Sequence, residues 1–168
     1  MSSTLSQRIQ QRAFVSPTQE TLLSLMVTQA WLSGEIVQLL SAHGITLSQY
    51  NVLRILRGSH PDTLTCSDIG ERLLDRTPDV TRLLDRLTRA GLTERTRSHT
   101  DRRVVLVGIT QDGLEVLSAI DPGINGFHER LSGALPPEDM QTLNALLERF
   151  RENGEHILTS QPEAADAS

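Results

Sequence analysis

The sequence predicts a mainly α-helical protein, a winged helix-turn-helix with N- and C-terminal dimerisation helices. Helix-start signals recur along the first half of the chain, each followed by a helical pattern of apolar residues. Between residues 92 and 109 the pattern becomes strand-like and rich in β-branched residues. Three short helices followed by a two-stranded hairpin is the order of a winged helix-turn-helix.

The 168 residues are expected to divide into four parts. Residues 1–15 are polar and predict a flexible N-terminal arm or a short helix. Residues 16–45 and 110–158 form a helical dimerisation region around the winged helix-turn-helix at 46–109. Residues 159–168 predict a disordered tail.

The first long helix begins at Ser16-Pro17-Thr18-Gln19. A serine N-cap, a proline at the first helical position and a glutamine three residues after the cap are typical of a helix start. The helix is apolar on more than one face, so we expect other helices to enclose it. Gly44 ends it in the left-handed cap position.

The two helices that follow have capping boxes of their own. Thr46-Leu47-Ser48-Gln49 opens a helix to about Arg57, and Thr65 with Asp68 caps a short one. Thr77-Pro78 then opens a helix that Gly91 ends.

Two strands are predicted next, from Leu92 to Arg97 and from Arg103 to Ile109. The polar residues 98–102 between them predict a β-hairpin with an extended tip. Thr110 caps a further helix, which Asp121-Pro122-Gly123 is expected to break or kink. A last helix begins at residues 136–139, which read Pro-Pro-Glu-Asp.

The charge is unevenly distributed. The chain has a formal net charge of −5, and all of its cationic residues are arginine. Residues 72–103 hold nine arginines against five acids and are +4, while the rest of the chain is −9. The acidic total therefore does not exclude a nucleic-acid partner.

The helix from Thr77 to Ala90 has two unlike faces. A 3.6-residue period puts one stripe of apolar residues on the helix, consisting of Val80, Leu83, Leu84, Leu87 and Ala90. The opposite side is rich in arginine and consists of Pro78, Arg82, Asp85, Arg86 and Arg89, flanked by Asp79 and Thr81. Such a helix fits the DNA major groove, where arginine reads guanine, and its free N-terminus suits a phosphate. The alternative is a solvated face with an Asp85–Arg89 pair, which the preceding short helix and tight turn disfavour.

The predicted hairpin is also rich in arginine. Arg95 and Arg97 lie on its first strand, and Arg102 and Arg103 start the second. A narrow tip of this kind suits the minor groove, whose negative potential attracts guanidinium groups. The alternative is an edge hairpin whose charges prevent strand addition. We expect Asp101 to pair with an arginine across the tip and stiffen it.

These segments resemble the MarR-type transcriptional regulators. The likeness is carried by TPDVTRLLDRL at 77–87, Ala-Gly-Leu at 90–92 and DRRVVLVGIT at 101–110. The family's wing pattern is met by Asp101, Arg103, Val107, Ile109 and Thr110. Residues 47–53 resemble the family's second helix and 66–74 its third, and the likeness extends over about residues 16–158.

The resemblance implies a triangular homodimer that presents recognition helices to successive major grooves. The residues on its recognition-helix positions are Thr77, Pro78, Asp79, Thr81, Arg82 and Arg86, and Arg103 lies on its minor-groove position. Arg97 and Arg102 complete the predicted DNA contacts. The sequence departs from the family at residues 121–126, where Pro122 and two glycines interrupt a region often written as one helix.

A dimer is also expected from the residues themselves. The terminal helices carry more apolar surface than a winged domain of about 65 residues covers, so a second copy is the expected partner. A twofold dimer requires a pseudo-palindromic operator with half-sites about 10 bp apart.

The resemblance further implies a small-molecule effector, because relatives bind aromatic acids near the junction of the first two helices. Met26, Trp31 and Tyr50 are the candidate lining residues, with plain core as the alternative. The one cysteine, Cys66, excludes a disulfide within the chain and is interpreted as a small buried hydrophobe rather than an oxidant sensor. The five histidines show no metal-ligand spacing, so neither a metal nor a cofactor is expected.

We therefore interpret the chain as a cytoplasmic, sequence-specific DNA-binding regulator with no membrane span. The hypothesis is a homodimeric repressor that a small ligand releases from double-stranded DNA. The sequence contains no nucleophile–base pair and no phosphate-binding loop, so we do not expect an enzyme. The alternatives are a winged-helix module that binds protein without binding DNA, and an enzyme or sensor whose DNA motif is vestigial.

Overall fold

The computed structural model of the chain describes residues 5–75, 79–98 and 100–160. Two compact units make up the chain, residues 1–124 and 125–168. The predictions for residues 1–4 and 161–168, and for Thr77 and Pro78, lie outside the described residues.

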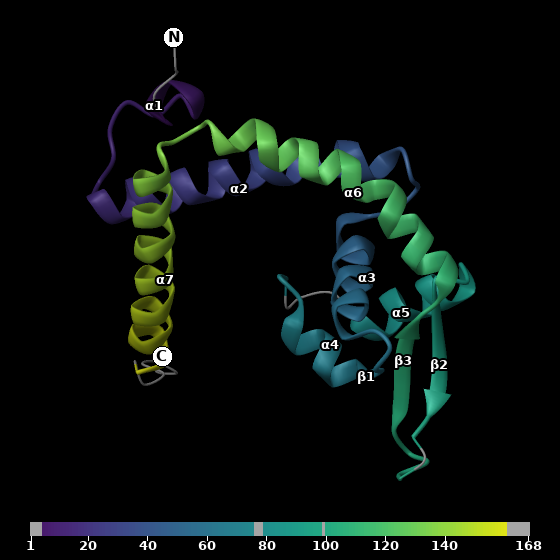
Figure 1. Cartoon of the computed structure of the whole chain (residues 1–168). Coiled ribbons are helices and arrows are strands. Elements are labelled where there is room, and N and C mark those ends of the chain that lie inside the picture. The colour runs from purple at the N-terminus through teal and green to yellow at the C-terminus, as the bar shows by residue number, and fades with distance from the viewer. Residues whose placement is uncertain (1–4, 76–78, 99, 161–168) are drawn as a thin grey trace. The chain divides into compact units, whose positions relative to one another are not determined.

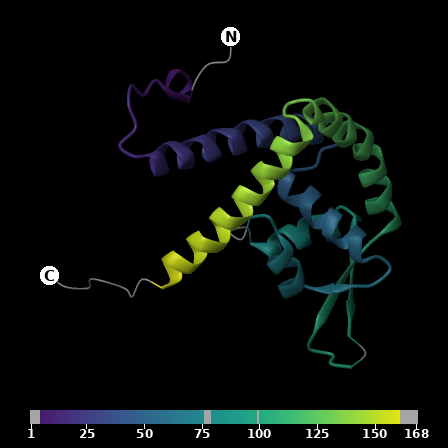
Figure 2. The same ribbon diagram turned by 60° about the vertical axis from the view of Figure 1, so that its left-hand side comes forward.

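The first unit contains the helices and strands of the predicted winged domain (Figure 1). Its elements are α1 (Leu5–Arg8), α2 (Pro17–Ser41), α3 (Leu47–Ser59), β1 (Leu64–Thr65), α4 (Cys66–Arg72), α5 (Val80–Arg89), β2 (Thr93–Arg97), β3 (Val105–Ile109) and the first part of α6 (Gln111–Ser132). The hairpin β2–β3 extends away from α3, α4 and α5 in both ribbon views (Figures 1 and 2).

The predicted helix starts are confirmed where they depend on local capping. The Ser16 hydroxyl accepts the Gln19 N–H at the start of α2. Capping boxes join Thr46 with Gln49 at α3 and Thr65 with Asp68 at α4. The glycine after α2, at position 44, has a φ of 67°, as its predicted role as a cap requires.

The sheet has three antiparallel strands in the order β1-β3-β2. In the hairpin Thr93 pairs with Ile109 and Arg97 with Val105. On the other edge of β3, Leu64 pairs with Val107. The sequence predicted only the hairpin, because the two residues of β1 are too few to show an alternating pattern.

One apolar core holds this unit together. It includes Leu53 and Leu56 of α3, Leu84 and Leu87 of α5, and Leu117 of α6, all almost fully buried. The stripe predicted on α5 is thus confirmed at Leu83, Leu84 and Leu87, whereas Ala90 is the C-cap and is exposed. Because α5 packs with this side inward, its arginine side faces solvent.

The helix α6 does not break at Pro122. Thr110 caps it by accepting the Gly113 N–H at 3.1 Å, and the helix is continuous through Pro122 to Ser132. A proline inside a helix costs about 3 kcal/mol. The burial of Leu117 and Ile120 in the turns before it offsets that cost. Of the predicted break or kink, the break is therefore wrong.

The second unit consists of the end of α6 and α7 (Pro137–Thr159). Pro137 occupies the first helical position of α7, as predicted. Figure 2 shows α7 as one uninterrupted helix. No residue of α7 is buried, although it carries an apolar stripe that includes Leu143, Leu146, Phe150 and Ile157.

Candidate nucleic-acid interface

The helix α5 begins later than the sequence predicted. Asp79 is its N-cap, with an extended backbone at φ −64° and ψ 91°, and Val80 is its first residue. The Asp79 carboxylate accepts the Arg82 N–H at 3.2 Å. The N-terminus predicted to be free for a phosphate therefore already has a carboxylate on one of its N–H groups.

The outward side of α5 presents exposed Thr81, Arg82, Arg86 and Arg89. The Arg82 side chain is 81% exposed, and its Nε lies 3.1 Å from Asp79 Oδ2. An exposed pair of this kind contributes about 0.2–1 kcal/mol, so Arg82 exchanges this partner for another acceptor at little cost. The outward side of α5 therefore presents guanidinium donors three or four residues apart, about one helical turn.

An ion pair joins α5 to the hairpin. Asp85 Oδ1 lies 2.7 Å from Arg95 Nη2 on β2, and neither side chain is fully exposed. The hydroxyls of Thr88 and Thr93 are 3.0 Å apart at the base of the same junction. The alternative Asp85–Arg89 pair is wrong, because Asp85 is bonded across to the strand. The two arginine-bearing elements are thus held together.

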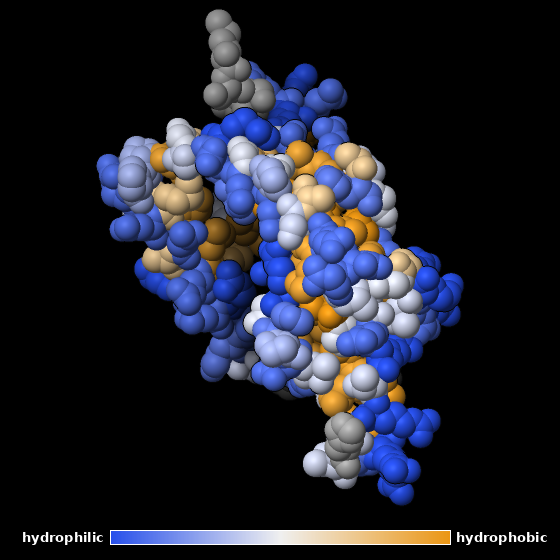
Figure 3. Space-filling view, turned by 45° about the vertical axis from the view of Figure 1, so that its right-hand side comes forward, coloured by the Kyte–Doolittle hydropathy of each residue, from blue (hydrophilic) through white to orange (hydrophobic). Residues whose placement is uncertain are grey.

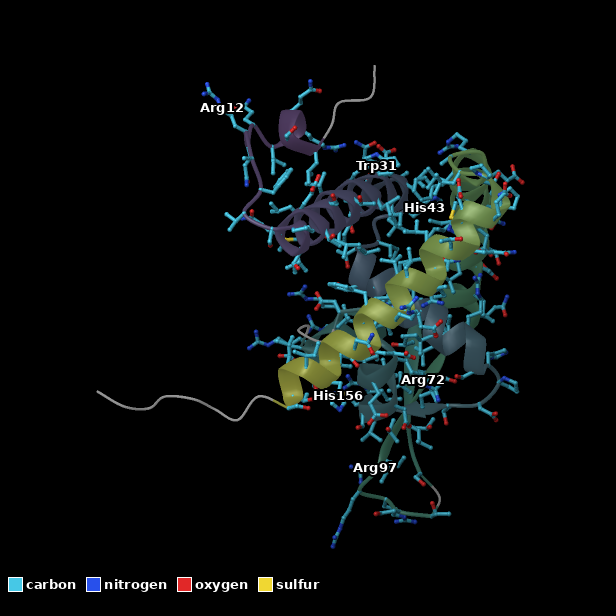
Figure 4. All side chains as sticks on the ribbon, turned by 90° about the vertical axis from the view of Figure 1, so that its left-hand side faces the viewer. Arg12, Trp31, His43, Arg72, Arg97 and His156 are labelled. Carbon is cyan, nitrogen blue, oxygen red and sulfur yellow. The ribbon has the colours of Figure 1, made fainter. Side chains whose placement is uncertain are left out.

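The tip of the hairpin carries three exposed arginines. Arg97 ends β2 near the tip (Figure 4), and Arg102 and Arg103 lie in the turn before β3. The predicted strand start at Arg103 is wrong, since β3 begins at Val105. The turn closes with a bond from the Val104 N–H to the Asp101 carbonyl at 3.0 Å. Figure 3 shows hydrophilic side chains gathered around this tip.

Asp101 stiffens the tip through the backbone. Its Oδ1 accepts the Arg103 N–H at 2.9 Å, and the Ser98 hydroxyl accepts the N–H groups of Thr100 and Asp101. We predicted a guanidinium partner for Asp101, but its carboxylate instead accepts a backbone N–H two residues further along the chain. The side chains of Arg102 and Arg103 consequently extend into solvent.

Comparison with known proteins identifies the family. A family model described as MarR family matches residues 45–105. A MarR transcription factor of known crystal structure from Planctomyces limnophilus is 37% identical and aligns over 81% of this chain and 98% of its own, with a TM-score of 0.61. The chain belongs to the MarR family. It is a MarR-type transcriptional regulator.

Two further similarities are to a protein solved in complex with DNA and to an operon repressor. The S. aureus MepR–DNA complex is 26% identical, with a TM-score of 0.71 over 79% of this chain and 96% of MepR. The homoprotocatechuate degradative operon repressor of Escherichia coli is 28% identical over 64% of this chain and 72% of its own length.

In this MarR-family chain the structure groups most of the predicted contact residues. Asp79, Thr81, Arg82 and Arg86 lie at the start and outward side of α5, and Arg97, Arg102 and Arg103 lie at the hairpin tip. Sequence reasoning missed the Asp85–Arg95 pair. Periodicity describes each element alone and gives no signal for a contact between a helix and the following strand.

The predicted effector residues lie on two helices. Met26 is 67% exposed on α2, where Trp31 is also exposed (Figure 4). Tyr50 is half-buried on α3 and packs against the core. An effector site at these residues stays a prediction.

The start of α4 holds Cys66 and Asp68. Cys66 is half-buried against the core, with its Sγ 3.9 Å from Thr81 Oγ1 on α5. The hydroxyl and then the backbone N–H of Thr65 hold the pKa of Asp68 below its ordinary value of 3.8. In the described part of the chain no group of three His, Cys, Asp or Glu side chains could bind a metal ion. No helix within those ranges is both long and apolar enough to span a bilayer.

Proposed function

We propose that this MarR-type regulator binds double-stranded DNA sequence-specifically as a homodimer. The observation that carries the proposal is the pairing of two exposed arginine surfaces, on α5 and on the hairpin tip. The Asp85–Arg95 ion pair links the two elements that carry them. The similarity to MepR, solved as a DNA complex, supports the same partner here.

In this proposal α5 enters the major groove. Arg82 and Arg86 are one turn apart on its exposed side and donate to base edges, guanine O6 and N7 being the acceptors that suit arginine best. Arg103 extends from the β2–β3 hairpin into the minor groove, and Arg97 and Arg102 contact the phosphates beside it. Thr77 and Pro78, together with Thr81 and Asp79, complete the proposed contact surface.

The homodimer is supported by the apolar residues that the protomer leaves exposed. Leu22 and Met26 on α2 and Leu146 and Phe150 on α7 are between 45% and 67% exposed. Burial of such side chains between two copies is worth about 1.5–3 kcal/mol for each one fully covered. A twofold dimer would bind a pseudo-palindromic operator.

We further propose that the protein is a repressor that a small ligand releases. The similarity to a repressor of a degradative operon supports the direction of regulation. The ligand would bind near Met26, Trp31 and Tyr50 and favour a conformation with lower DNA affinity. The proposal includes no enzymatic step.

Selection of bound duplexes from a random DNA pool tests sequence specificity and palindromy together. On the selected duplex, Arg82→Ala should lose about 1–3 kcal/mol of discrimination at one base position. Arg103→Ala should weaken binding to all duplexes and reduce the salt dependence. Arg151→Ala, which removes an exposed arginine from α7, is the matched control.

Wild-type binding by both Arg82→Ala and Arg103→Ala in a mobility-shift titration would contradict this interface. A wild-type protein without salt-dependent DNA affinity would instead favour the winged-helix module that binds another protein.

A further inference from the structure

A second ion pair joins the winged domain to the helix that leaves it. Arg57 Nη1, near the end of α3, lies 2.7 Å from Asp121 Oδ2 on α6. The two side chains are 34% and 35% exposed and lie 64 residues apart in the sequence. The other two ion pairs described above lie at α5 and between α5 and β2.

The Arg57–Asp121 pair lies next to the proline inside α6. Leu117, Ile120 and Ile124 form the stripe with which α6 packs on the core, and Asp121 lies within its last turn. Pro122 follows directly and has no N–H, so the Ser118 carbonyl loses its helical bond. The helix α6 therefore lacks one backbone hydrogen bond next to the residue that Arg57 binds.

The direction of α6 matters for DNA recognition. It is the covalent connection from the winged domain to α7, whose exposed apolar stripe is proposed to be a dimer surface. In a twofold dimer, the angle between the winged domain and this connection determines how far apart the two α5 helices lie. A change of that angle changes which half-site spacing the dimer fits.

We propose that Arg57 and Asp121 are positioning residues that set the half-site spacing the dimer accepts. The inference rests on the proposed DNA-binding function and adds a specificity determinant outside the DNA-contacting surface. Unlike the exposed Arg82, the Arg57 side chain is only 34% exposed and is bonded to Asp121 on another helix, so it makes no phosphate contact in this scheme.

The test compares Arg57→Gln, Asp121→Asn and the exchanged pair R57D with D121R. Arg54→Gln is the matched control, because Arg54 is exposed on the same helix and bonds only to Asn51 within that helix in the described contacts. The probes are the duplex selected by the wild-type protein and versions with one base pair added or removed between the half-sites.

We expect both single variants to lower the preference for the selected spacing, by up to about fivefold for an ion pair of this exposure. The exchanged pair should restore part of the preference, and Arg54→Gln should leave it unchanged. The salt dependence of binding should stay at the wild-type slope in Arg57→Gln, because no phosphate contact is lost.

Amide hydrogen exchange without DNA provides an independent readout. Exchange over residues 118–124 should be faster in Arg57→Gln and Asp121→Asn than in the wild type and the control. Unchanged exchange in both variants, or unchanged spacing preference in both, would overturn the inference. So would a reduced salt slope in Arg57→Gln alone, which would make Arg57 a phosphate contact. A wild-type protein that binds no duplex would refute the proposed function, and the spacing role with it.

Discussion

At the scale of single residues, Arg95 and Arg97 lie on the same strand but are expected to act differently. Arg95 is bonded to Asp85, whereas Arg97 is exposed near the hairpin tip. Arg95→Gln should weaken DNA binding through loss of the ion pair, worth about 0.2–1 kcal/mol, and keep the wild-type salt slope. Arg97→Gln should reduce that slope by about one, as loss of a phosphate contact does.

Titration of DNA affinity against salt concentration measures this difference. Asp85→Asn should behave like Arg95→Gln, because either change breaks the same pair. Equal losses of slope in Arg95→Gln and Arg97→Gln would show that Arg95 contacts phosphate.

Asp68 gives a prediction about pH. Bonds from the hydroxyl and then the backbone N–H of Thr65 lower the pKa of Asp68 in the folded protein. A carboxyl with a lowered folded pKa stabilises the fold above its unfolded pKa, and this contribution is lost as the pH falls through the folded value. The free energy of unfolding should therefore decline below about pH 4 less steeply in Asp68→Asn than in the wild type.

Urea denaturation at several pH values measures that decline. Asp62→Asn, at an exposed turn position six residues earlier, is the control and should keep the wild-type pH dependence. The role of Asp68 as a cap would be wrong if the two variants lost stability alike at every pH.

At the scale of elements, the start of α6 is tightly packed against the hairpin. A Cβ at Gly113 would collide with the Leu92 carbonyl oxygen and lie 2.7 Å from Ile109 Cγ1. Gly113→Ala should destabilise the protein by about 1–3 kcal/mol, the usual cost of overpacking. Gly58→Ala on α3 meets nothing within 4 Å and should stabilise it by about 0.5–1 kcal/mol. Thermal unfolding of the two variants should thus shift in opposite directions.

Elements were predictable where their determinants are local. The capping boxes of Thr46 and Thr65 involve residues three positions apart, so both helix starts could be read from the sequence. The β1 strand exists only because Leu64 meets Val107, far away in the chain. Likewise, packing of Leu117 and Ile120 on the core, rather than any local signal, keeps α6 continuous through Pro122.

The candidate site was predictable to the same extent. Helical periodicity alone separated the buried Leu84 and Leu87 from the exposed Arg82 and Arg86. It could not show that Asp85 bonds to Arg95, because that contact depends on how α5 and β2 pack. The sequence therefore indicated well which side chains face solvent. It indicated poorly which side chains bond to one another.

At the scale of the whole molecule, net charge is a poor guide to the partner. The chain is −5 overall, yet residues 72–103 are +4 and contain the exposed arginines of both α5 and the hairpin tip. Sixteen of the 21 acids lie outside this segment. They would repel DNA from other parts of the protein and thus favour one binding surface.

The apolar stripe of α7 gives the last prediction. Phe150 is 45% exposed in the protomer, so a charge there is tolerated by the isolated fold but not by a dimer interface that covers it. A twofold interface contains the change twice. Phe150→Glu should raise the dimer dissociation constant at least about a hundredfold, corresponding to roughly 3 kcal/mol. Because a single winged domain reaches only one half-site, operator affinity should fall with it.

Sedimentation velocity over a range of concentrations measures the dimer constant. Gln141→Glu introduces the same charge on the opposite side of α7 and should leave the protein dimeric. If Phe150→Glu sediments like Gln141→Glu, then α7 does not form the interface, and the apolar residues of α2 would have to bury the contact alone. Loss of helical signal in Phe150→Glu together with loss of the dimer would instead show that the fold depends on the second copy.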